Sequence, residues 1–534
     1  MILVNQIRLP LEDGSDVAIQ KALAILHLSQ SNVKSVGLAK ISVDARHATP
    51  CLVYTVAVQM EHLRDELPFG SFAPNVSIAN PRPFVLTHGK KKMRHRPIVC
   101  GLGPAGLFCA LALAREGYRP IVLERGAEMS QRIAAVNAFR MGGSLAPNAN
   151  IQFGEGGAGT FSDGKLTTRI RDPLCGYVTE TLLKHGAPPE IVIQQKPHIG
   201  TDQLRDVIVS LRKEIESLGG TIHFNTPLTG ISMQNGQLVS VQTPKGAFAC
   251  ETLVLAVGHS ARDTFAMLKD TGFTLQAKPF SVGFRAEHLQ SRIEESLYRG
   301  AAGHPALPRG EYQLSQHIGG RCVYTFCMCP GGEVVAAASE ENGLVTNGMS
   351  LHARAGKNAN AAVVVSVNEA DFHGDAMEAI AFQRTLEQAA FAAGGGDYTA
   401  PAENVQSFLK GDGTLQISDV QPTYPRGVAA ANLGALLPKE LADTLRTGLV
   451  AFEQKLSGYT AKEVVLTGLE TRTSSPVRLP RSDNGVSLDC AGVYPCGEGT
   501  GYAGGIMSAA TDGLRMAKNI METFCPKAGR GRES

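Results

Sequence analysis

The segment PIVCGLGPAGLFCALALAREGYRPIVLERG, residues 97–126, decides the fold that this sequence predicts. A short apolar run leads into three glycines with the spacing G-x-G-x-x-G. Residues 104–116 then have helical composition, Gly117 provides a helix stop, and a second apolar run ends on Glu124. Strand, glycine turn, helix and strand in this order are typical of a βαβ unit that binds a dinucleotide. The three glycines are Gly101, Gly103 and Gly106.

Each glycine of this turn has a separate physical task. The first permits a tight turn, the second lets the backbone approach a pyrophosphate, and the third lets helix and strand pack closely. The phosphates then lie against N–H groups at the helix start, around Pro104 and Ala105. Glu124 can accept hydrogen bonds from an adenosine ribose, and its charge argues against the 2′-phosphate of NADP. Glycines at such a turn can also serve packing alone, but here strand, helix, spacing and acid agree on FAD or NAD.

Composition and charge limit the other functions of the chain. Charged residues make up 19% of it and the net charge is only +2, so no overall field favours nucleic acid as a partner. The N-terminus shows no signal peptide, and the uncharged residues 98–114 are too few and too glycine-rich to span a membrane. Eleven cysteines without a disulfide framework suit a reducing compartment. We therefore expect a cytoplasmic protein without a transmembrane segment.

A second glycine segment, residues 492–520, lies near the other end of the chain. A buried strand runs into Gly497 and Glu498, and a glycine loop and a helix with small residues follow. An NAD site built on one βαβ unit does not need this element. It resembles flavoproteins of the glutathione reductase superfamily, and that resemblance implies that the late acid contacts the ribityl chain while the helix N-terminus faces the flavin. The usual acid there is Asp, and Glu498 is one methylene longer.

Further motifs narrow the resemblance. TLVLAVGHSARDT, residues 252–264, resembles the strand-then-glycine motif of that superfamily, and residues 150–169 take the place of its glycine-rich loop. The chain as a whole is similar to bacterial FAD-dependent dehydrogenases described as NAD(FAD)-utilising, up to about residue 524. The motifs that carry this similarity are ISVDARH (41–47), GEGGAGTFSDGKL (154–166), KPHIGTDQL (196–204), TFCMCPGG (325–332), TNGMS (346–350), ETRTSSPVR (470–478) and GEGTGYAGGIMSAA (497–510).

The resemblance implies FAD as the cofactor and a set of residues that bind it, but no particular substrate. Arg125 and Arg132 are expected near the adenosine or the phosphates, and Gly258 turns beside the cofactor. The expected cofactor-binding residues are Gly101, Gly103, Pro104, Ala105, Gly106, Glu124, Arg125, Arg132, Gly156, Gly157, Ala158, Gly159, Lys165, Gly258, Gly497, Glu498, Gly504, Gly505 and Ile506.

We expect an α/β fold of the FAD/NAD(P)-binding Rossmann-like type, as in glutathione reductase, with an inserted α+β domain and a small N-terminal α+β domain. In the N-terminal domain, residues 2–9, 35–43 and 51–60 read as strands, and a helix begins at Ser15. Prolines and asparagines accumulate in residues 68–96, as in a linker. The expected parts are 1–88 (N-terminal domain), 89–96 (basic linker), 97–270 and 461–524 (two parts of the FAD domain), 271–460 (inserted substrate or cap domain) and 525–534 (tail).

Side chains for the chemistry are harder to assign. Lys165 either lies by the flavin or is a surface lysine. His198 with Asp202 could be an acid and its partner, although a helix cap at Thr201 or Asp202 is the commoner explanation. The two arginines of residues 470–478 suit an anionic substrate group, the carbonyl edge of the flavin or plain structural hydrogen bonding. No zinc-ligand spacing and no G-x-S-x-G occur, so no metal is expected and the catalytic residues are left open.

The sequence as a whole favours an FAD-dependent oxidoreductase, a dehydrogenase or reductase that moves a hydride or electron pair between a small organic substrate and a second donor or acceptor. Only one G-x-G-x-x-G directly follows an apolar strand and opens a helix, so an NAD(P)H donor would have to dock transiently. One alternative is a flavoprotein that binds tRNA or a protein through the N-terminal domain and the basic residues 90–96, although solvated linker charge is the simpler explanation. Another is disulfide reduction through Cys327 and Cys329, which would share one face of a strand.

Overall fold

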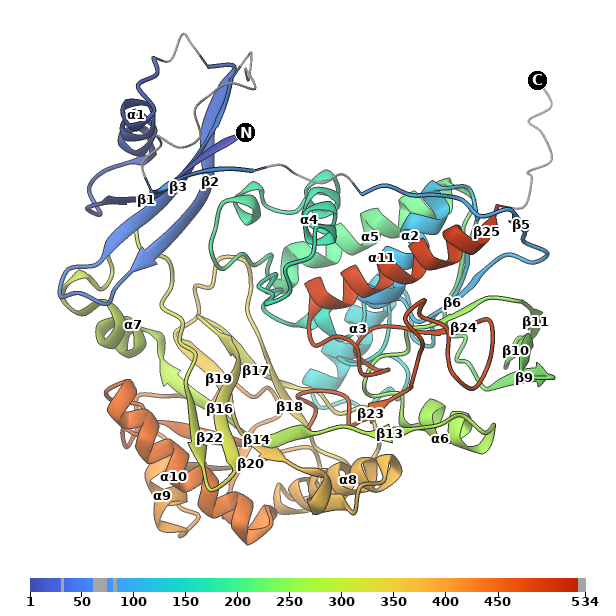
Figure 1. The fold of residues 1–534 in the computed structure, drawn as a ribbon. Helices are drawn as coiled ribbons and strands as arrows, with labels where there is room; N and C mark the ends of the chain where they lie inside the picture. Colours follow the sequence, from blue (N-terminus) through green and yellow to red (C-terminus); the bar gives the residue numbers. More distant parts are fainter. Residues whose placement is uncertain (30–32, 61–73, 80–83, 527–534) are drawn as a thin grey trace.

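The computed structural model describes residues 1–29, 33–60, 74–79 and 84–526, which form a small N-terminal domain, a domain around a parallel sheet and a domain inserted into it (Figure 1). The N-terminal domain is an antiparallel sheet of order β2-β3-β1-β4 with one helix packed against β1 and β3. Alternate residues of β3 are buried, as a half-covered strand requires. The elements are β1 Ile2–Leu9, α1 Ser15–Ile25, β2 Ser35–Asp44, β3 Cys51–Gln59 and β4 Val76–Ile78.

Three of these strands and the helix lie where the sequence predicts them. The strand β4 was not expected, because it falls in the proline-rich stretch that reads as a linker; it pairs with β1 as an edge strand. Within that stretch, residues 68–73 and 80–83 lie outside the described residues. Helix α1 begins at Ser15, but Gly14 is its N-cap and no side chain caps it.

The basic linker is held against the C-terminal end of the chain. Strand β5, Lys91–Lys92, pairs in parallel with β25, Phe524–Cys525. The ammonium group of Lys91 lies 4.8 Å from the centre of the Phe524 ring. Arg94 pairs with Glu251, and Arg96 donates to the carbonyl oxygens of residues 119, 120 and 219. Part of the linker charge is therefore used within the molecule.

A five-stranded parallel sheet of order β24-β12-β6-β7-β8 forms the centre of the second domain. It contains the predicted βαβ unit together with the strand that precedes the second glycine segment, which lies two places away from β6. The first helix after the glycines, α2, packs on the last long helix, α11. The bounds are β6 Ile98–Cys100, α2 Pro104–Arg115, β7 Ile121–Leu123, β8 Thr221–His223, β12 Leu253–Leu255, β24 Val493–Pro495 and α11 Ile506–Thr523.

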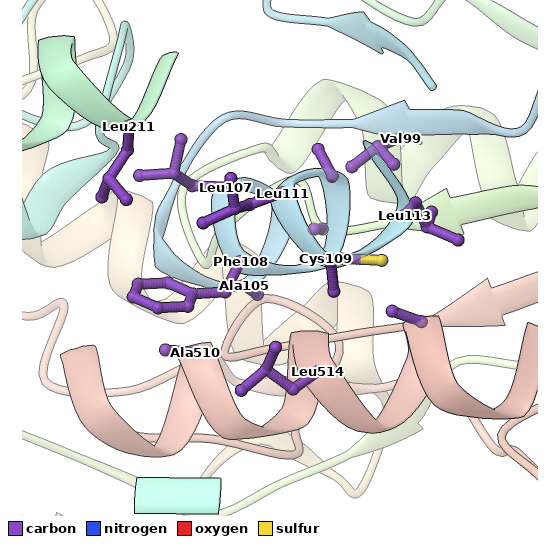
Figure 2. Packing of buried hydrophobic residues seen from close by; sticks show 14 of the residues in the cluster. Val99, Ala105, Leu107, Phe108, Cys109, Leu111, Leu113, Leu211, Ala510 and Leu514 are labelled. Atoms are coloured by element: carbon purple, nitrogen blue, oxygen red, sulfur yellow. The ribbon is translucent and has the colours of Figure 1, made fainter. Parts of the chain in front are cut away.

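The packing of α2 on α11 brings the two glycine segments together. Figure 2 shows Ala105 and Phe108 of α2 facing Ala510 and Leu514 of α11. A Cβ at Gly513 would lie only 2.0 Å from the carbonyl oxygen of Ala105, so the two backbones touch. Nearly every residue of α2 is buried, which is why its sequence reads as an apolar run without an exposed face.

Further helices and a small sheet complete this domain. The helix that Thr201 or Asp202 could cap is α5, and its N-cap is Gly200 rather than either of them. A three-stranded antiparallel sheet, β9-β10-β11, extends from the parallel sheet before β12. The bounds are α3 Met129–Arg140, α4 Leu174–Lys184, α5 Thr201–Ser217, β9 Gly230–Gln234, β10 Gln237–Thr243, β11 Gly246–Ala249 and α6 Arg262–Asp270.

The inserted domain is built on a seven-stranded, largely antiparallel sheet of order β15-β16-β19-β14-β22-β20-β21. Helix α10 contacts β15, β16 and β19, and α8 contacts β20 and β22. Buried β-branched and aromatic side chains of the strands form its core. The bounds are β14 Phe280–Leu289, α7 Gln290–Tyr298, β15 Ser315–Ile318, β16 Arg321–Cys329, β17 Glu333–Ala336, β18 Thr346–Met349, β19 Asn358–Val367, α8 Ala376–Ala393, β20 Ala400–Asn404, α9 Val405–Lys410, β21 Val428–Ala430, α10 Lys439–Lys455 and β22 Val465–Glu470.

The boundary expected at residue 460 lies too early. Strand β22 pairs with β14 and β20 inside the inserted sheet. The chain therefore returns to the domain around the parallel sheet only after Glu470. The entry and the exit of the insertion lie side by side as a two-stranded pair, β13 Gln276–Ala277 with β23 Val477–Arg478. The sequence misplaces this boundary because β22 is a buried strand like those of the parallel sheet. The mixed α/β character is as predicted.

Candidate active site

A cavity of about 770 Å³ lies where the parallel strands end and the inserted sheet begins. We call its two sides the glycine wall and the inserted-sheet wall. The glycine wall consists of Gly101, Gly103, Pro104, Ala105, Gly157, Ala158, Gly159, Gly258, Gly497, Gly504, Gly505 and Ile506. The inserted-sheet wall consists of Glu311, Tyr312, Gln313, Thr325, Phe326, Cys327, Met328, Asn347, Arg472 and Thr473.

The structure brings most of the expected cofactor-binding residues to this one cavity. Besides the glycine wall, Glu124, Arg125, Lys165 and Glu498 line it. Three expected residues, Gly106, Arg132 and Gly156, do not. These three residues lie behind the residues that line the cavity, and each stabilises a backbone turn.

The glycine wall leaves room for a ligand because its glycines have no side chains that would fill the cavity. A Cβ at Gly258, Gly504 or Gly505 would meet no protein atom within 4 Å, so these glycines keep space open in the cavity. Gly106 and Gly101 serve packing, because a Cβ at Gly106 would lie 1.9 Å from the carbonyl oxygen of Gly101. The sequence could not separate these two uses of glycine.

Helices α2 and α11 both begin at the cavity, and neither has a side-chain cap. The N–H groups of a first helical turn have no partner within the helix, and the helix dipole adds positive potential there. Two such helix ends at one cavity suit a ligand with anionic or strongly accepting groups at two places. FAD has this chemistry, with phosphates at one place and the N1–C2=O edge of the flavin at another, so the residues present fit FAD.

Glu124 holds the backbone around it as well as lining the cavity. Its carboxylate accepts hydrogen bonds from the N–H groups of Leu102 (2.8 Å), Gly126 (2.8 Å) and Gly154 (3.1 Å). These bonds fix the first glycine turn, β7 and the glycine-rich loop to one another. A carboxylate has about four lone-pair positions, so it can still accept a ribose hydroxyl.

Arg132 is a structural residue of the glycine-rich loop. It is fully buried and donates to the carbonyl oxygens of Asn150, Ile151 and Glu155 at 2.6–3.0 Å. Arg125, by contrast, lines the cavity, pairs with Asp263 and lies over the Phe153 ring. The sequence placed both arginines near the cofactor, because it gives no sign of which one points into the loop.

The second glycine turn is fixed by a residue that sequence reasoning missed. The N–H of Gly497 donates to the carboxylate of Asp512 at 2.8 Å, and Asp512 is paired with Arg481 at 2.6 Å. Asp512 is fully buried on α11, in the stretch GGIMSAATDG. A lone Asp in an otherwise apolar helix face was the available signal.

Glu498 lies in the cavity beside this turn. Burial raises its pKa to about 7, and Lys278 offsets that rise in part. Around neutral pH the carboxyl group can therefore donate as well as accept a hydrogen bond. Such a group suits a neutral, hydroxyl-rich partner such as a ribityl chain.

A cluster of charges lies at the other end of the cavity, next to the inserted-sheet wall. Lys165 donates to Asp163 (2.6 Å) and Glu311 (3.1 Å). Lys196 also pairs with Glu311, and Arg354 pairs with Asp163. Burial alone would lower the pKa of Lys165, but Asp163 and Glu311 raise it, so the ammonium group stays charged. Three cations and two carboxylates leave the cluster with one net positive charge.

His198 and Asp202 do not pair with each other. The Nε2 atom of His198 is bonded to the carbonyl oxygen of His352, and Asp202 accepts from the N–H of His352. Burial, and then the charge of Arg354, lower the pKa of His198. Neither residue lines the cavity, so the sequence-based pairing as an acid and its partner has no geometric support.

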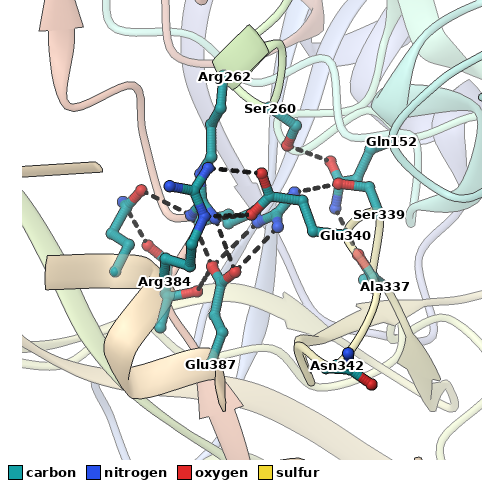
Figure 3. Close-up of polar contacts among 12 residues, drawn as sticks. Gln152, Ser260, Arg262, Ala337, Ser339, Glu340, Asn342, Arg384 and Glu387 are labelled. Atoms are coloured by element: carbon teal, nitrogen blue, oxygen red, sulfur yellow. Dashed lines mark hydrogen bonds and ion pairs between the residues drawn. The ribbon is translucent and has the colours of Figure 1, made fainter. Parts of the chain in front are cut away.

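Buried ion pairs connect the inserted domain to the domain around the parallel sheet. Glu387 of α8 accepts from Arg262, at the start of α6, and from Arg472, just after β22 (Figure 3). Arg262 also pairs with Glu340, which in turn pairs with Arg384. Arg472 is the arginine of the 470–478 motif that lines the cavity. This cluster therefore fixes the inserted-sheet wall relative to the glycine wall.

Comparisons with known proteins agree with this geometry. Residues 279–473 match the family described as FAD-dependent protein, C-terminal domain-like, and residues 1–59 match a domain of unknown function (DUF8436). A Clostridium beijerinckii protein that carries only the name uncharacterized protein is 42% identical over 528 residues, which are 98% of this chain and 99% of that protein. The chain belongs to the same family as this clostridial protein. The description of the matched family, FAD-dependent protein, supports FAD as the cofactor.

Solved structures resemble the chain only distantly. Glycine oxidase from Geobacillus kaustophilus is 12% identical with a TM-score of 0.35, and 81% of this chain and 96% of that chain are covered. CtdE in complex with FAD is 14% identical with a TM-score of 0.32, and 80% and 88% are covered. Likenesses this low indicate nothing about the substrate.

In residues 1–29, 33–60, 74–79 and 84–526, no helix is long and apolar enough to cross a membrane. Within the same ranges, no group of three or more His, Cys, Asp or Glu residues could hold a metal ion.

Proposed function

We propose that the chain is an FAD-dependent dehydrogenase or reductase whose small, anionic organic substrate binds between the flavin and the inserted-sheet wall. The observation that carries this proposal is the single cavity with two chemically different walls. One wall offers backbone N–H groups and two helix ends, and the other offers side chains from an unrelated sheet. Bound FAD supplies the transfer of a hydride or an electron pair.

The residues of the chain would bind FAD, orient it and close the cavity around it. Glu124 and the glycine turn around Gly103 would hold the adenosine and the phosphates, while Glu498 would hold the ribityl chain. Helix α11, which begins at Ile506, would place its positive end at the carbonyl edge of the flavin. The inserted-sheet wall closes the cavity on the opposite side and limits the access of water to the reacting groups.

The charge cluster around Lys165 indicates the chemical class of the substrate. Lys165 and Glu311 of this positively charged cluster line the same cavity as the apolar side chains of Phe326 and Met328, so a small carboxylate with an apolar body fits the cavity. Lys165 orients the anionic group, and Glu311 keeps the lysine in place at 3.1 Å.

The broader relation to glutathione reductase, the docking of NAD(P)H at the ring and a cytoplasmic location are parts of the same proposal.

An anaerobic spectrum of the purified protein tests the proposal. We expect bound flavin absorbance that is bleached by NADH or NADPH and returns when an acceptor is added. A Lys165→Met variant should keep the flavin but respond more weakly to anionic substrates. A colourless protein that takes up no added FAD would contradict the proposal.

The tRNA-binding alternative gains no support, because Lys91, Arg94 and Arg96 of the basic linker have partners within the chain.

A further inference from the structure

Two cysteines of the inserted-sheet wall lie together at the end of β16. Cys327 lines the cavity, and Cys329 is fully buried beside it. The thiol of Cys329 lies 3.4 Å from the carbonyl oxygen of Cys327. The side chains of the two residues also share a hydrogen bond. Cys322 of the same strand does not line the cavity and is five residues away from Cys327.

The backbone at Cys327 departs from a regular strand. Phe326 pairs with Ala362 and Cys329 pairs with Asn360, so two residues of β16 face one residue of β19 in a bulge. Within this bulge Cys327 has φ +43°, a left-handed conformation that favours glycine. Such a conformation costs free energy in a residue other than glycine, so the packing around the bulge has to hold Cys327 in it. Arg285 maintains the bulge by donating to the carbonyl oxygen of Cys327 at 2.8 Å.

Charged groups from several elements surround the Cys327 thiol. The hydrogen bond from Cys329, and then Arg285 of β14 and Lys165 of the glycine-rich loop, lower its pKa to about 6, although burial and Asp163 oppose this. Glu470 of β22 and Glu498 also face it. The pKa of Cys329 is raised well above its ordinary value by the Cys327 thiolate and by burial. One reactive thiolate next to one neutral thiol is the arrangement of a nucleophilic and a resolving cysteine.

We propose that Cys327 and Cys329 are a redox-active pair that exchanges electrons with FAD in the cavity and with a thiol or disulfide of a small substrate. In the reducing direction, the Cys327 thiolate attacks one sulfur of a substrate disulfide and the first substrate thiol leaves. The Cys329 sulfur then attacks the Cys327 sulfur, which forms the protein disulfide and releases the second thiol. Two electrons and two protons from reduced FAD reopen that disulfide.

This inference rests on the proposed function only for the identity of the electron partner, FAD. The disulfide itself can be tested without turnover. Trypsin releases residues 322–354 as one peptide, which contains Cys322, Cys327 and Cys329. The purified protein is equilibrated in dithiothreitol buffers of increasing oxidised fraction, its free thiols are alkylated, and the peptide is weighed by mass spectrometry.

We expect an internal disulfide in the oxidised wild-type peptide and in the Cys322→Ser control, but in neither Cys327→Ser nor Cys329→Ser. Cys327→Gly serves as a second variant, because glycine fits the left-handed backbone and keeps the strand folded. Three free thiols in every buffer would overturn the inference. A disulfide that persists in Cys327→Ser would overturn it as well, because Cys322 would then be the partner.

The reactivity of Cys327 gives an independent readout. The rate of its alkylation by iodoacetamide should follow a titration with a midpoint near pH 6 in the wild type and in Cys322→Ser. In Cys329→Ala the midpoint should move to higher pH, because the hydrogen bond that stabilises the thiolate is removed. A midpoint near the ordinary value for cysteine in the wild type would contradict the proposed nucleophile.

Electron counting tests the exchange with FAD. Anaerobic dithionite should deliver two electron pairs to each wild-type molecule, one to FAD and one to the disulfide, but only one pair to Cys329→Ser. Equal uptake by both proteins would overturn the exchange. A protein that contains no flavin would overturn the proposed function instead, and its colourless spectrum distinguishes that outcome from the absence of a disulfide in the peptide.

Discussion

The glycine wall and the inserted-sheet wall enclose the same cavity but are built from different parts of the chain. Backbone turns that directly follow parallel strands make the glycine wall, as at Gly101 after β6 and Gly497 after β24. Side chains from β16, from β18, from the loop before β15 and from the residues just after β22 make the inserted-sheet wall. The first wall depends on local backbone geometry, and the second depends on how separate elements pack. The two walls should therefore fail in different ways when they are mutated.

The largest effect is expected from Gly101→Ala in the glycine wall. A Cβ there would lie 2.2 Å from the carbonyl oxygen of Ala256, and the backbone has φ +100°. Overlap and left-handed strain together should cost about 4 kcal/mol of unfolding free energy. Bound flavin, measured by absorbance per protein, should be lost almost completely. The control Gly176→Ala meets no atom within 4 Å and should keep both flavin and stability; a fully yellow Gly101→Ala protein would contradict the argument.

The next effect is expected from Glu387→Gln, which breaks the connection between the two walls. Burial opposes ionisation of Glu387, but Arg472 and Arg262 lower its pKa, so the ionised carboxylate neutralises two buried guanidinium groups. Its removal should cost about 3 kcal/mol, as measured by urea unfolding. Flavin per folded molecule should change little, because the glycine wall is intact. The exposed pair of Arg292 with Glu295 supplies the control, and a loss in Glu295→Gln as large as that in Glu387→Gln would argue against the burial effect.

A smaller effect is expected from Glu498→Gln, and it depends on pH. The folded protein keeps a proton on Glu498 up to about pH 7, whereas the unfolded chain loses it near pH 4.5. Wild-type stability should therefore fall as pH rises between these two values and level off above them. The half-buried position reduces this contribution to about 1 kcal/mol, which the variant should recover at pH 8. Thermal unfolding at pH 5 and pH 8 measures the difference, and the exposed Glu180→Gln should leave it unchanged.

The smallest effect is expected outside both walls, from Lys91→Ser in the basic linker. This change removes the contact of the ammonium group with the Phe524 ring and should cost less than about 1 kcal/mol. Flavin content should stay the same, as should that of the exposed control Lys90→Ser. If Lys91→Ser instead lost flavin, the linker would have to be counted with the cavity.

The sequence predicted one wall better than the other for a physical reason. The turns at Gly103 and Gly497 are local, because strand, glycine and helix follow each other along the chain. Cys327 and Glu311 reach the cavity only through the pairing of β16 and the approach of a separate loop, which no local pattern encodes. Asp512, the anchor of the second turn, was missed because it is fifteen residues beyond the glycine that it binds.

The sequence by itself determined the βαβ unit, the flavin cofactor, the positions of α1, α2 and α11 and the residues of the glycine wall. Steric limits on glycine turns and the periodicity of apolar residues act over short stretches, so one-dimensional reading captures them. Only the tertiary structure decided that Arg132 supports a loop, that β22 belongs to the inserted sheet and that Cys327 faces the cavity. Those outcomes depend on long-range pairing and on the burial of charges, whose free energies are set by neighbours far away in the sequence.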